Sequence, residues 1–126
     1  MENIKILVVE DENIVALDLE SRLKGLGFTV LPVISSGEEA VEKAYEYKPD
    51  LILMDILLKG KINGIEAAKK IVGTLKIPII YLTASTNREV LERARQVGRC
   101  SYITKPFMGK ELENAIKTLL KSKLTS

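Results

Sequence analysis

Strand-like and helix-like patterns alternate along this chain of 126 residues, and this alternation restricts the fold more than any other feature. Short apolar runs rich in β-branched residues are each followed by a stretch with helical periodicity. Five such runs are present, at residues 4–9, 28–33, 51–54, 79–82 and 101–104. The third run, LILM, is apolar throughout, which is typical of a parallel strand covered by helices on both faces.

The segments between these runs carry the signals of helices. Residues 12–26 have apolar side chains that share one helical face: Val15, Leu19, Leu23 and Leu26. Three more helices are predicted from capping boxes, in which Ser, Asn or Thr precedes a Glu by three residues, at Ser36, Asn63 and Thr86. A fifth helix is predicted from about Lys110.

A chain of this length fits one domain. Alternation of strands and helices predicts an α/β fold in which right-handed crossovers place helices on both faces of a parallel sheet. For five strands we predict a flavodoxin-like (βα)5 three-layer sandwich with the strand order 2-1-3-4-5. Strands 1 and 3 are then neighbours at the point where the strand order reverses, and ligands bind there, at the carboxyl edge of such sheets.

Acidic residues follow the two strands that meet at this point. Glu10 and Asp11 follow the first strand, and Asp55 follows the third. One acid of the first pair could simply cap the next helix while the other offsets its dipole. Mg²⁺, however, prefers hard oxygen ligands and is usually held by one or two carboxylates with waters and phosphate oxygens. The convergence of three acids favours a magnesium site.

Polar residues at the other strand ends would complete a phosphoryl-transfer site. As a nucleophile, Asp55 would attack a phosphoryl group and form an acyl phosphate. Thr83 would donate its hydroxyl to one phosphoryl oxygen, and the ammonium of Lys105 would neutralise another. Taken singly, Thr83 could be a capping hydroxyl and Lys105 a solvated amine. Tyr102 is either a half-buried strand tyrosine or a rotating switch that senses movement of Thr83 toward a phosphate.

Composition excludes several classes of function. The chain has no histidine, which excludes histidine-dependent acid–base catalysis, histidine metal ligands and Ser-His or Cys-His nucleophile pairs. A phosphoryl group arriving from a phosphohistidine must therefore come from another protein. The net charge of +2, with acids and bases interspersed, gives no case for nucleic-acid or membrane binding. With no signal-peptide pattern and a single cysteine, Cys100, a cytoplasmic location is expected.

Five motifs follow one another along the sequence: ILVVEDE, DLILMDILL, NGIEAA, PIIYLTA and YITKPF. In this order they resemble the receiver domain of two-component response regulators, and the resemblance covers essentially the whole chain. It implies a phosphorelay in which a histidine kinase or a histidine phosphotransfer protein donates a phosphoryl group to Asp55. It also implies slow loss of that group by autodephosphorylation.

The resemblance assigns roles to individual residues. Lys105 would be the phosphate-binding lysine, and Thr83 and Tyr102 would be the switch residues. Mg²⁺ would be bound by three carboxylates and one carbonyl: Glu10, Asp11, Asp55 and the backbone carbonyl of Leu57. Glu10 stands where Asp is commoner, and its longer side chain would reach the metal through water.

The loop after Asp55 departs from the common pattern of the family. It reads LLKGKING, without the proline of an MMPGMDG-type loop and one residue longer. We interpret it as the mark of an LKG-type subfamily. Residues 1–126 are expected to be a receiver domain without an output domain, because transcription-regulating receivers continue into a DNA-binding domain that this sequence lacks.

Such a domain would act through protein contacts with a downstream target that the sequence does not identify. We expect a monomer or a weak, phosphorylation-dependent dimer that neither binds DNA nor inserts into membranes. The contact face would combine the fourth helix, fifth strand and fifth helix, including Arg88, Arg95, Tyr102 and Lys110.

Other functions compete with that of a phosphoacceptor. A phosphorylation-independent interaction module is the main alternative, although the intact set of Asp55, Thr83 and Lys105 argues against it. Phosphohydrolases with an aspartyl nucleophile usually need a second acid two residues later, where this chain has Leu57. A dinucleotide site would need a glycine-rich loop after the first strand. A flavin-binding protein shares the fold, and only the acid-rich edge argues against it.

Overall fold

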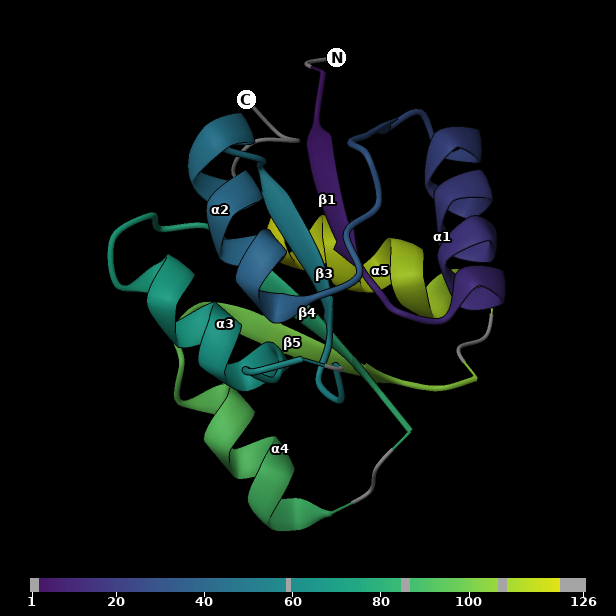
Figure 1. Ribbon diagram of the computed structural model, residues 1–126. Helices are drawn as coiled ribbons and strands as arrows, with labels where there is room; N and C mark the ends of the chain where they lie inside the picture. Colours follow the sequence, from purple (N-terminus) through teal and green to yellow (C-terminus); the bar gives the residue numbers. More distant parts are fainter. Residues whose placement is uncertain (1–2, 59, 85–86, 107–108, 121–126) are drawn as a thin grey trace.

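The computed structural model describes residues 3–58, 60–84, 87–106 and 109–120. These residues form five strands that alternate with five helices (Figure 1): β1 (Lys5–Val9), α1 (Asn13–Gly25), β2 (Thr29–Val30), α2 (Gly37–Tyr47), β3 (Leu51–Asp55), α3 (Gly64–Val72), β4 (Ile79–Thr83), α4 (Arg88–Arg95), β5 (Cys100–Thr104) and α5 (Gly109–Leu119). All strand pairs are parallel and the order is β2-β1-β3-β4-β5. The predicted flavodoxin-like fold and strand order are confirmed.

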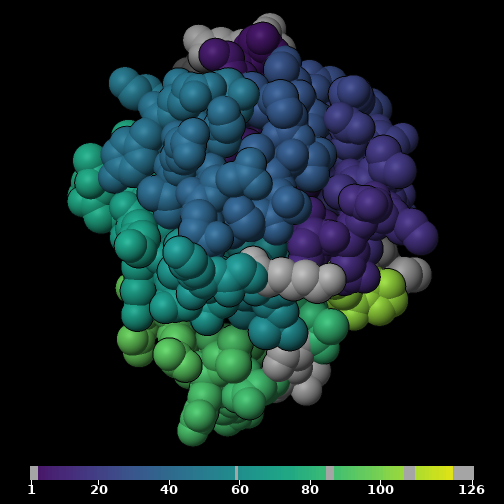
Figure 2. Space-filling model, viewed as in Figure 1, coloured from purple at the N-terminus to yellow at the C-terminus, as the bar shows by residue number. Residues whose placement is uncertain are grey.

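Helices cover both faces of the sheet and produce the three predicted layers. Neighbouring residues of a strand point to opposite faces, so each strand contributes to two cores. In β1, Leu7 belongs to the core that includes residues of α2, α3 and α4, whereas Val8 belongs to the core that includes residues of α1 and α5. The same division is visible in Figure 1, where α1 and α5 lie together and α2, α3 and α4 lie on the other side. Figure 2 shows α2 packed against the segment that follows β3.

The helices begin at the predicted caps, with one shift. Ser36 accepts the N–H of the third residue after it at 3.2 Å. Asn63 and Glu66 form a complete capping box, with bonds of 2.9 and 3.0 Å in the two directions. The cap of α4 is Asn87, one residue after the predicted Thr86, which lies outside the described residues.

The second strand is shorter than its apolar run. The run predicted residues 28–33, whereas β2 contains only Thr29–Val30. The N–H groups of Thr29 and Leu31 donate to β1, but the next donor is Ile34 rather than Val33, so the register shifts by one residue after Leu31. Pairing resumes for one residue at an isolated bridge between Ile34 and Val9.

The apolar face of α1 also ends earlier than the sequence pattern. Leu19 and Leu23 are fully buried, as predicted. Leu26 is partly exposed, because it is the C-cap residue and lies beyond the last turn. None of the helices within the described ranges combines the length and the apolar character that a membrane span requires.

The strand register places the predicted site residues at one edge. Val9 is paired with Met54, so Glu10 and Asp55 are the next residues along two neighbouring strands. Thr83 ends β4, beside the end of β3. Because the strands are parallel, all these side chains lie at the carboxyl edge of the sheet.

Candidate functional site

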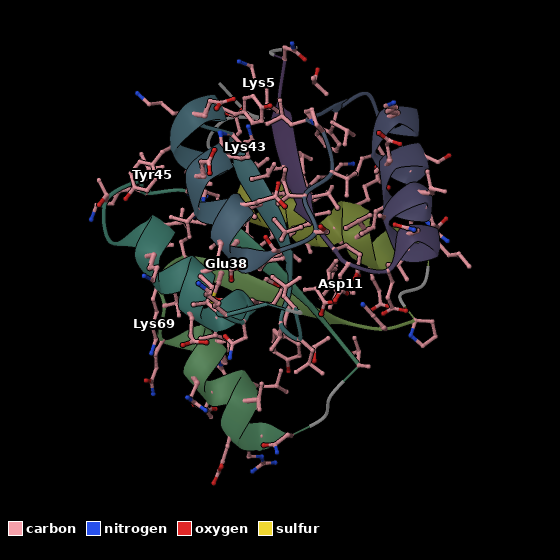
Figure 3. The ribbon with its side chains drawn as sticks, viewed as in Figure 1. Lys5, Asp11, Glu38, Lys43, Tyr45 and Lys69 are labelled. Carbon is pink, nitrogen blue, oxygen red and sulfur yellow. The ribbon has the colours of Figure 1, made fainter. Side chains whose placement is uncertain are left out.

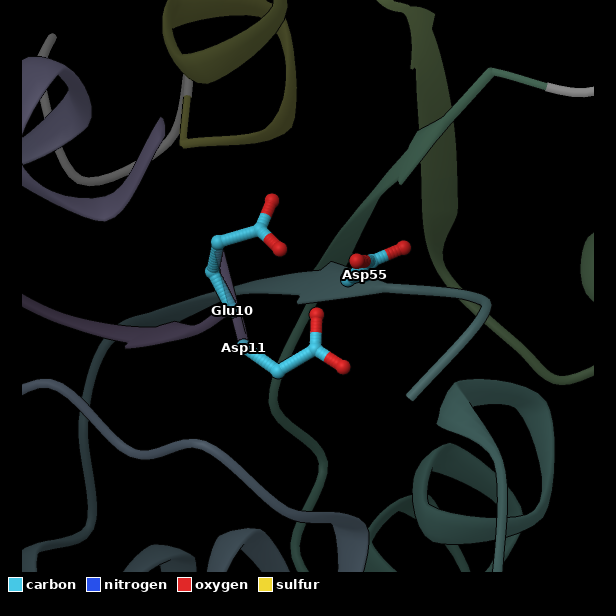
Figure 4. Close-up of side chains that lie close together, drawn as sticks. All are labelled: Glu10, Asp11 and Asp55. Atoms are coloured by element: carbon cyan, nitrogen blue, oxygen red, sulfur yellow. The ribbon is translucent and has the colours of Figure 1, made fainter. Parts of the chain in front are cut away.

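Three carboxylates meet at the carboxyl edge of β1 and β3. Asp11 lies at the lower end of β1 in Figure 3, and the close-up in Figure 4 shows its carboxylate next to those of Glu10 and Asp55. One oxygen of each residue lies within 4.8 Å of the others. Glu10 and Asp55 are buried, and Asp55 is only 4% exposed. This all-oxygen set of donors suits Mg²⁺.

The concentration of negative charge changes the acidity of Glu10. Burial, together with a hydrogen bond to Asp55 and the charge of Asp55, raises the pKa of Glu10 to about 7. Lys105 and the N–H of Glu12 oppose this effect without cancelling it. Because like charges in a buried site disfavour ionisation, a divalent cation would stabilise the charged form of the cluster. The arrangement therefore fits the predicted metal site.

Lys105 is the cation that the protein itself supplies to this cluster. Its Nζ lies 2.7 Å from Oε1 of Glu10 and 3.3 Å from Oδ2 of Asp55. Burial lowers the pKa of Lys105, but bonding to Glu10 and the charge of Asp55 outweigh burial and raise it above its ordinary value. The side chain is only 15% exposed, so the alternative of a solvated amine is wrong. The peptide bond between Lys105 and Pro106 is cis.

The structure adds Glu12 to the site, which the sequence prediction omitted. Glu12 is the N-cap residue of α1, but its carboxylate makes no capping hydrogen bond. Its Oε1 lies instead 3.3 Å from Nζ of Lys105. The only sequence signal was the uninterrupted acidic run from residue 10 to residue 12. Because Glu12 is largely exposed, its ion pair lies at the rim of the site.

A second omitted residue is Gly64, at the start of α3. A Cβ atom at this position would lie 2.1 Å from the backbone oxygen of Asp55, which leaves no room for any side chain. The N–H of Gly64 donates to the carbonyl of Ile56 at 2.9 Å. In the side chain of Asp55, Oδ1 accepts the N–H of Leu57 at 3.0 Å. Asp55 is thus held by its neighbours in both its backbone and its side chain.

The predicted switch residues lie on β4 and β5. Thr83 ends the strand next to β3; it is buried, and its carbonyl accepts the N–H of Lys105 at 2.7 Å. Tyr102 lies on the strand beyond, paired with Tyr81 in the register of β4 and β5, on the face of the sheet that α4 covers. Tyr81 is fully buried, whereas Tyr102 is 43% exposed. Tyr102 is therefore a half-buried tyrosine at the edge of the sheet.

An apolar groove of about 700 Å³ opens beside Lys105. Its lining residues come from α1 and from the ends of β4 and β5: Glu12, Ile14, Val15, Asp18, Arg22, Ala84, Lys105 and Pro106. Ile14 is 84% exposed, and its neighbour Leu17 is also largely exposed. An exposed aliphatic surface next to a charged site is typical of a protein-binding surface.

Sequence comparison finds a family model and relatives that are longer than this chain. The model of the response regulator receiver domain matches residues 6–117. The transcriptional regulatory protein PdtaR of Mycobacterium tuberculosis is 38% identical over 113 residues, covering 90% of this chain and 55% of that protein. The alkaline phosphatase synthesis transcriptional regulatory protein PhoP of Bacillus subtilis is 38% identical over 120 residues, covering 94% and 49%. The chain spans about half the length of these regulators.

Receiver domains are among the solved structures with the same fold, as two examples show. The signal receiver domain of a modulated diguanylate cyclase from Desulfovibrio desulfuricans G20 has a TM-score of 0.87 and 35% identity, covering 99% of this chain and 100% of that one. The receiver domain of the sensor histidine kinase PA1611 from Pseudomonas aeruginosa PAO1 has a TM-score of 0.85 and 31% identity, covering 95% and 99%. That structure has a magnesium ion coordinated in its active-site cleft.

Proposed function

The chain belongs to the family of response regulator receiver domains of two-component signalling, and on this basis we propose that it is the phosphoacceptor of a phosphorelay. Asp55 would take a phosphoryl group from a histidine kinase or a histidine phosphotransfer protein. One observation carries the proposal: Asp55 is buried in the acidic cluster, with Nζ of Lys105 3.3 Å from its Oδ2. Because residues 1–126 contain no histidine, a phosphohistidine donor would lie outside these residues.

Magnesium is the proposed cofactor. Asp11, Asp55 and the backbone carbonyl of Leu57 would hold the ion directly, and Glu10 would bind it through water. The proposal is supported by the all-oxygen donors of the cluster and by the raised pKa of Glu10. When bound, the ion would offset the negative charge of the transferring phosphoryl group.

Three residues of the chain would each contribute to the phosphoryl transfer. A carboxylate oxygen of Asp55 would attack phosphorus, so that a P–O bond forms as the P–N bond to the donor imidazole breaks. The imidazole leaves with the electron pair of that bond and takes its proton from solvent. Lys105 would neutralise one phosphoryl oxygen, and the hydroxyl of Thr83 would donate to another. Slow attack of water on the acyl phosphate would return Asp55 to its carboxylate.

The groove beside Lys105 is the proposed docking surface for the phosphoryl donor. A donor must bring a histidine side chain to Asp55, and the groove opens next to the lysine that contacts this acid. Ile14 offers an exposed aliphatic contact in the groove, and Leu17 offers a second one nearby on α1. Burial of such side chains supplies affinity for a partner helix or sheet.

Signal output would use the edge of the sheet formed by β5, with α4 on one side of it and α5 on the other. Tyr102 would follow Thr83 inward after phosphorylation and alter the face that includes Arg88, Arg95 and Lys110. We propose that residues 1–126 act in the cytoplasm, as a monomer or a weak phosphorylation-dependent dimer. Cell fractionation, and ultracentrifugation with and without phosphorylation, would test these points.

The proposed function is tested by intact-protein mass spectrometry after incubation with Mg²⁺ and acetyl phosphate. The wild type should gain one phosphoryl group, and the gain should disappear in Asp55→Asn and when Mg²⁺ is removed. If neither acetyl phosphate nor a phosphorylated histidine kinase adds mass, and Mg²⁺ titration shows no binding, the protein is a phosphorylation-independent interaction module.

A further inference from the structure

A carboxylate from α2 holds the loop that leads from the acceptor strand β3 to α3. Glu38 lies in the first turn of α2, and Figure 3 shows it at the end of this helix that faces the start of α3. Its Oε1 accepts the backbone N–H of Ile62 at 3.0 Å. The two residues are far apart in the sequence, so this bond joins two separate elements. Glu38 makes no contact with the acidic cluster itself.

The packing around this bond is close. Gly60 has a φ of +110°, and a Cβ atom there would lie 3.0 Å from Oε2 of Glu38. Gly37 is equally crowded, since its Cβ would lie 2.8 Å from Cγ1 of Ile62 and 2.9 Å from its carbonyl oxygen. At the contact between α2 and the segment after β3 in Figure 2, each glycine thus lies close to a residue of the other segment, and Glu38 is bonded across it.

Two other hydrogen bonds hold the same segment, one on each side of the bond between Glu38 and Ile62. At one end the N–H of Leu57 donates to Asp55, and at the other the N–H of Asn63 donates to Glu66. The described part of the loop contains no proline to stiffen it. Its shape therefore depends on these side-chain acceptors, and Glu38 is the acceptor that comes from outside the loop and its helix.

We propose that Glu38 is a positioning residue for the phosphoacceptor site. By accepting the N–H of Ile62 and lying against Gly60, it would hold the far end of the loop that begins at Leu57, whose carbonyl is the proposed fourth ligand of Mg²⁺. The inference rests on the proposed function, since it concerns the same site. Groups that orient metal ligands without touching the metal contribute strongly to metal affinity.

The experiment compares Glu38→Ala and Glu38→Gln with Glu42→Ala, which removes an exposed acid from the same helix. Mg²⁺ alone is titrated into each protein by calorimetry, and phosphorylation by acetyl phosphate is followed at low and saturating Mg²⁺. Glu38→Ala should bind Mg²⁺ about threefold to tenfold more weakly. Its phosphorylation should be slow at low Mg²⁺ and recover at saturating Mg²⁺. Glu38→Gln, whose amide oxygen still accepts the N–H of Ile62, should resemble the wild type, as should Glu42→Ala.

Two results would overturn the inference: Mg²⁺ affinity of Glu38→Ala equal to that of Glu42→Ala, or affinity of Glu38→Gln as weak as that of Glu38→Ala. Should Glu38→Ala not fold, Gly60→Ala disturbs the same contact from the side of the loop. Unchanged Mg²⁺ affinity of Gly60→Ala would then overturn the inference. Failure of the proposed function is distinguished because the wild type itself would then take no phosphoryl group.

Discussion

Glu10 shows how the fold changes the chemistry of one side chain. In the sequence it is one acid among three in a row, but in the structure it is buried beside Asp55. Burial and the neighbouring carboxylate raise its pKa to about 7, and the ammonium of Lys105 at 2.7 Å restrains the rise. Below about pH 7 the site thus holds a proton on Glu10, which a cation would displace.

Without divalent cations, titration of Glu10 should make the free energy of unfolding fall as the pH rises. The fall should occur between pH 4.5, the ordinary pKa of this side chain, and about pH 7. In this range the folded protein keeps a proton that the unfolded chain has released, so raising the pH favours unfolding. Glu10→Gln cannot titrate and should lack this part of the slope. Urea unfolding at a series of pH values measures the difference, and identical slopes in the two proteins would contradict the prediction.

Gly64 is important because its surroundings leave no space for a side chain. Gly64→Ala should lower the free energy of unfolding by about 1–3 kcal/mol or more, because the new methyl group meets the backbone oxygen of Asp55. Gly25→Ala is the matched control, since a Cβ there has no atom within 4 Å. That control should be neutral or stabilising by up to about 1 kcal/mol, because Ala favours helix more than Gly. Equal stability of the two variants in urea would refute this explanation.

The helices differ in how firmly they attach to the sheet. Five residues of α3 are buried, but only Ala94 is buried in α4, all of which lies in the described part of the chain. The cap residue Asn87 accepts the N–H groups of Glu89 and Val90 and offsets part of this weakness. Because local stability follows buried apolar contact, α4 is the helix best suited to move during signalling.

Amide hydrogen exchange should therefore be faster in α4 than in α3. Asn87→Ala should increase the exchange of α4 further, since loss of an N-cap costs about 1 kcal/mol. Exchange followed by mass spectrometry of proteolytic peptides measures both effects, and exchange in α3 serves as the internal control. Equal protection of the two helices in the wild type would show that α4 is not loosely held.

Patterns along the chain predicted the elements well because helix caps and apolar periodicity are local. The capping box of Asn63 depends on only four consecutive residues. The errors occurred at the ends of elements. β2 stops at Val30, and Leu26 is an exposed cap residue.

For the molecule as a whole, binding of Mg²⁺ and folding should be linked. A ligand that binds only the folded state adds about 1.4 kcal/mol to the free energy of unfolding when its concentration is tenfold above its dissociation constant. Mg²⁺ should therefore raise the melting temperature of the wild type in a concentration-dependent way. Asp11→Asn should lose most of this effect, and Glu42→Ala should keep it. Thermal melts in which Mg²⁺ affects all three proteins equally would exclude Asp11 as a ligand.

The sequence alone determined the fold class and the edge at which the candidate site lies. These follow from alternation of two periodicities and from polar residues at strand ends, which are properties of consecutive residues. The strand order was predicted from the fold class and the number of strands. The sequence also identified the acids, Thr83 and Lys105 as candidates. Only the tertiary structure decided that Lys105 bonds to Glu12, that Gly64 has no space for a side chain and that Glu38 holds the loop. Those contacts join residues distant in the chain, and their geometry depends on how whole helices pack against the sheet.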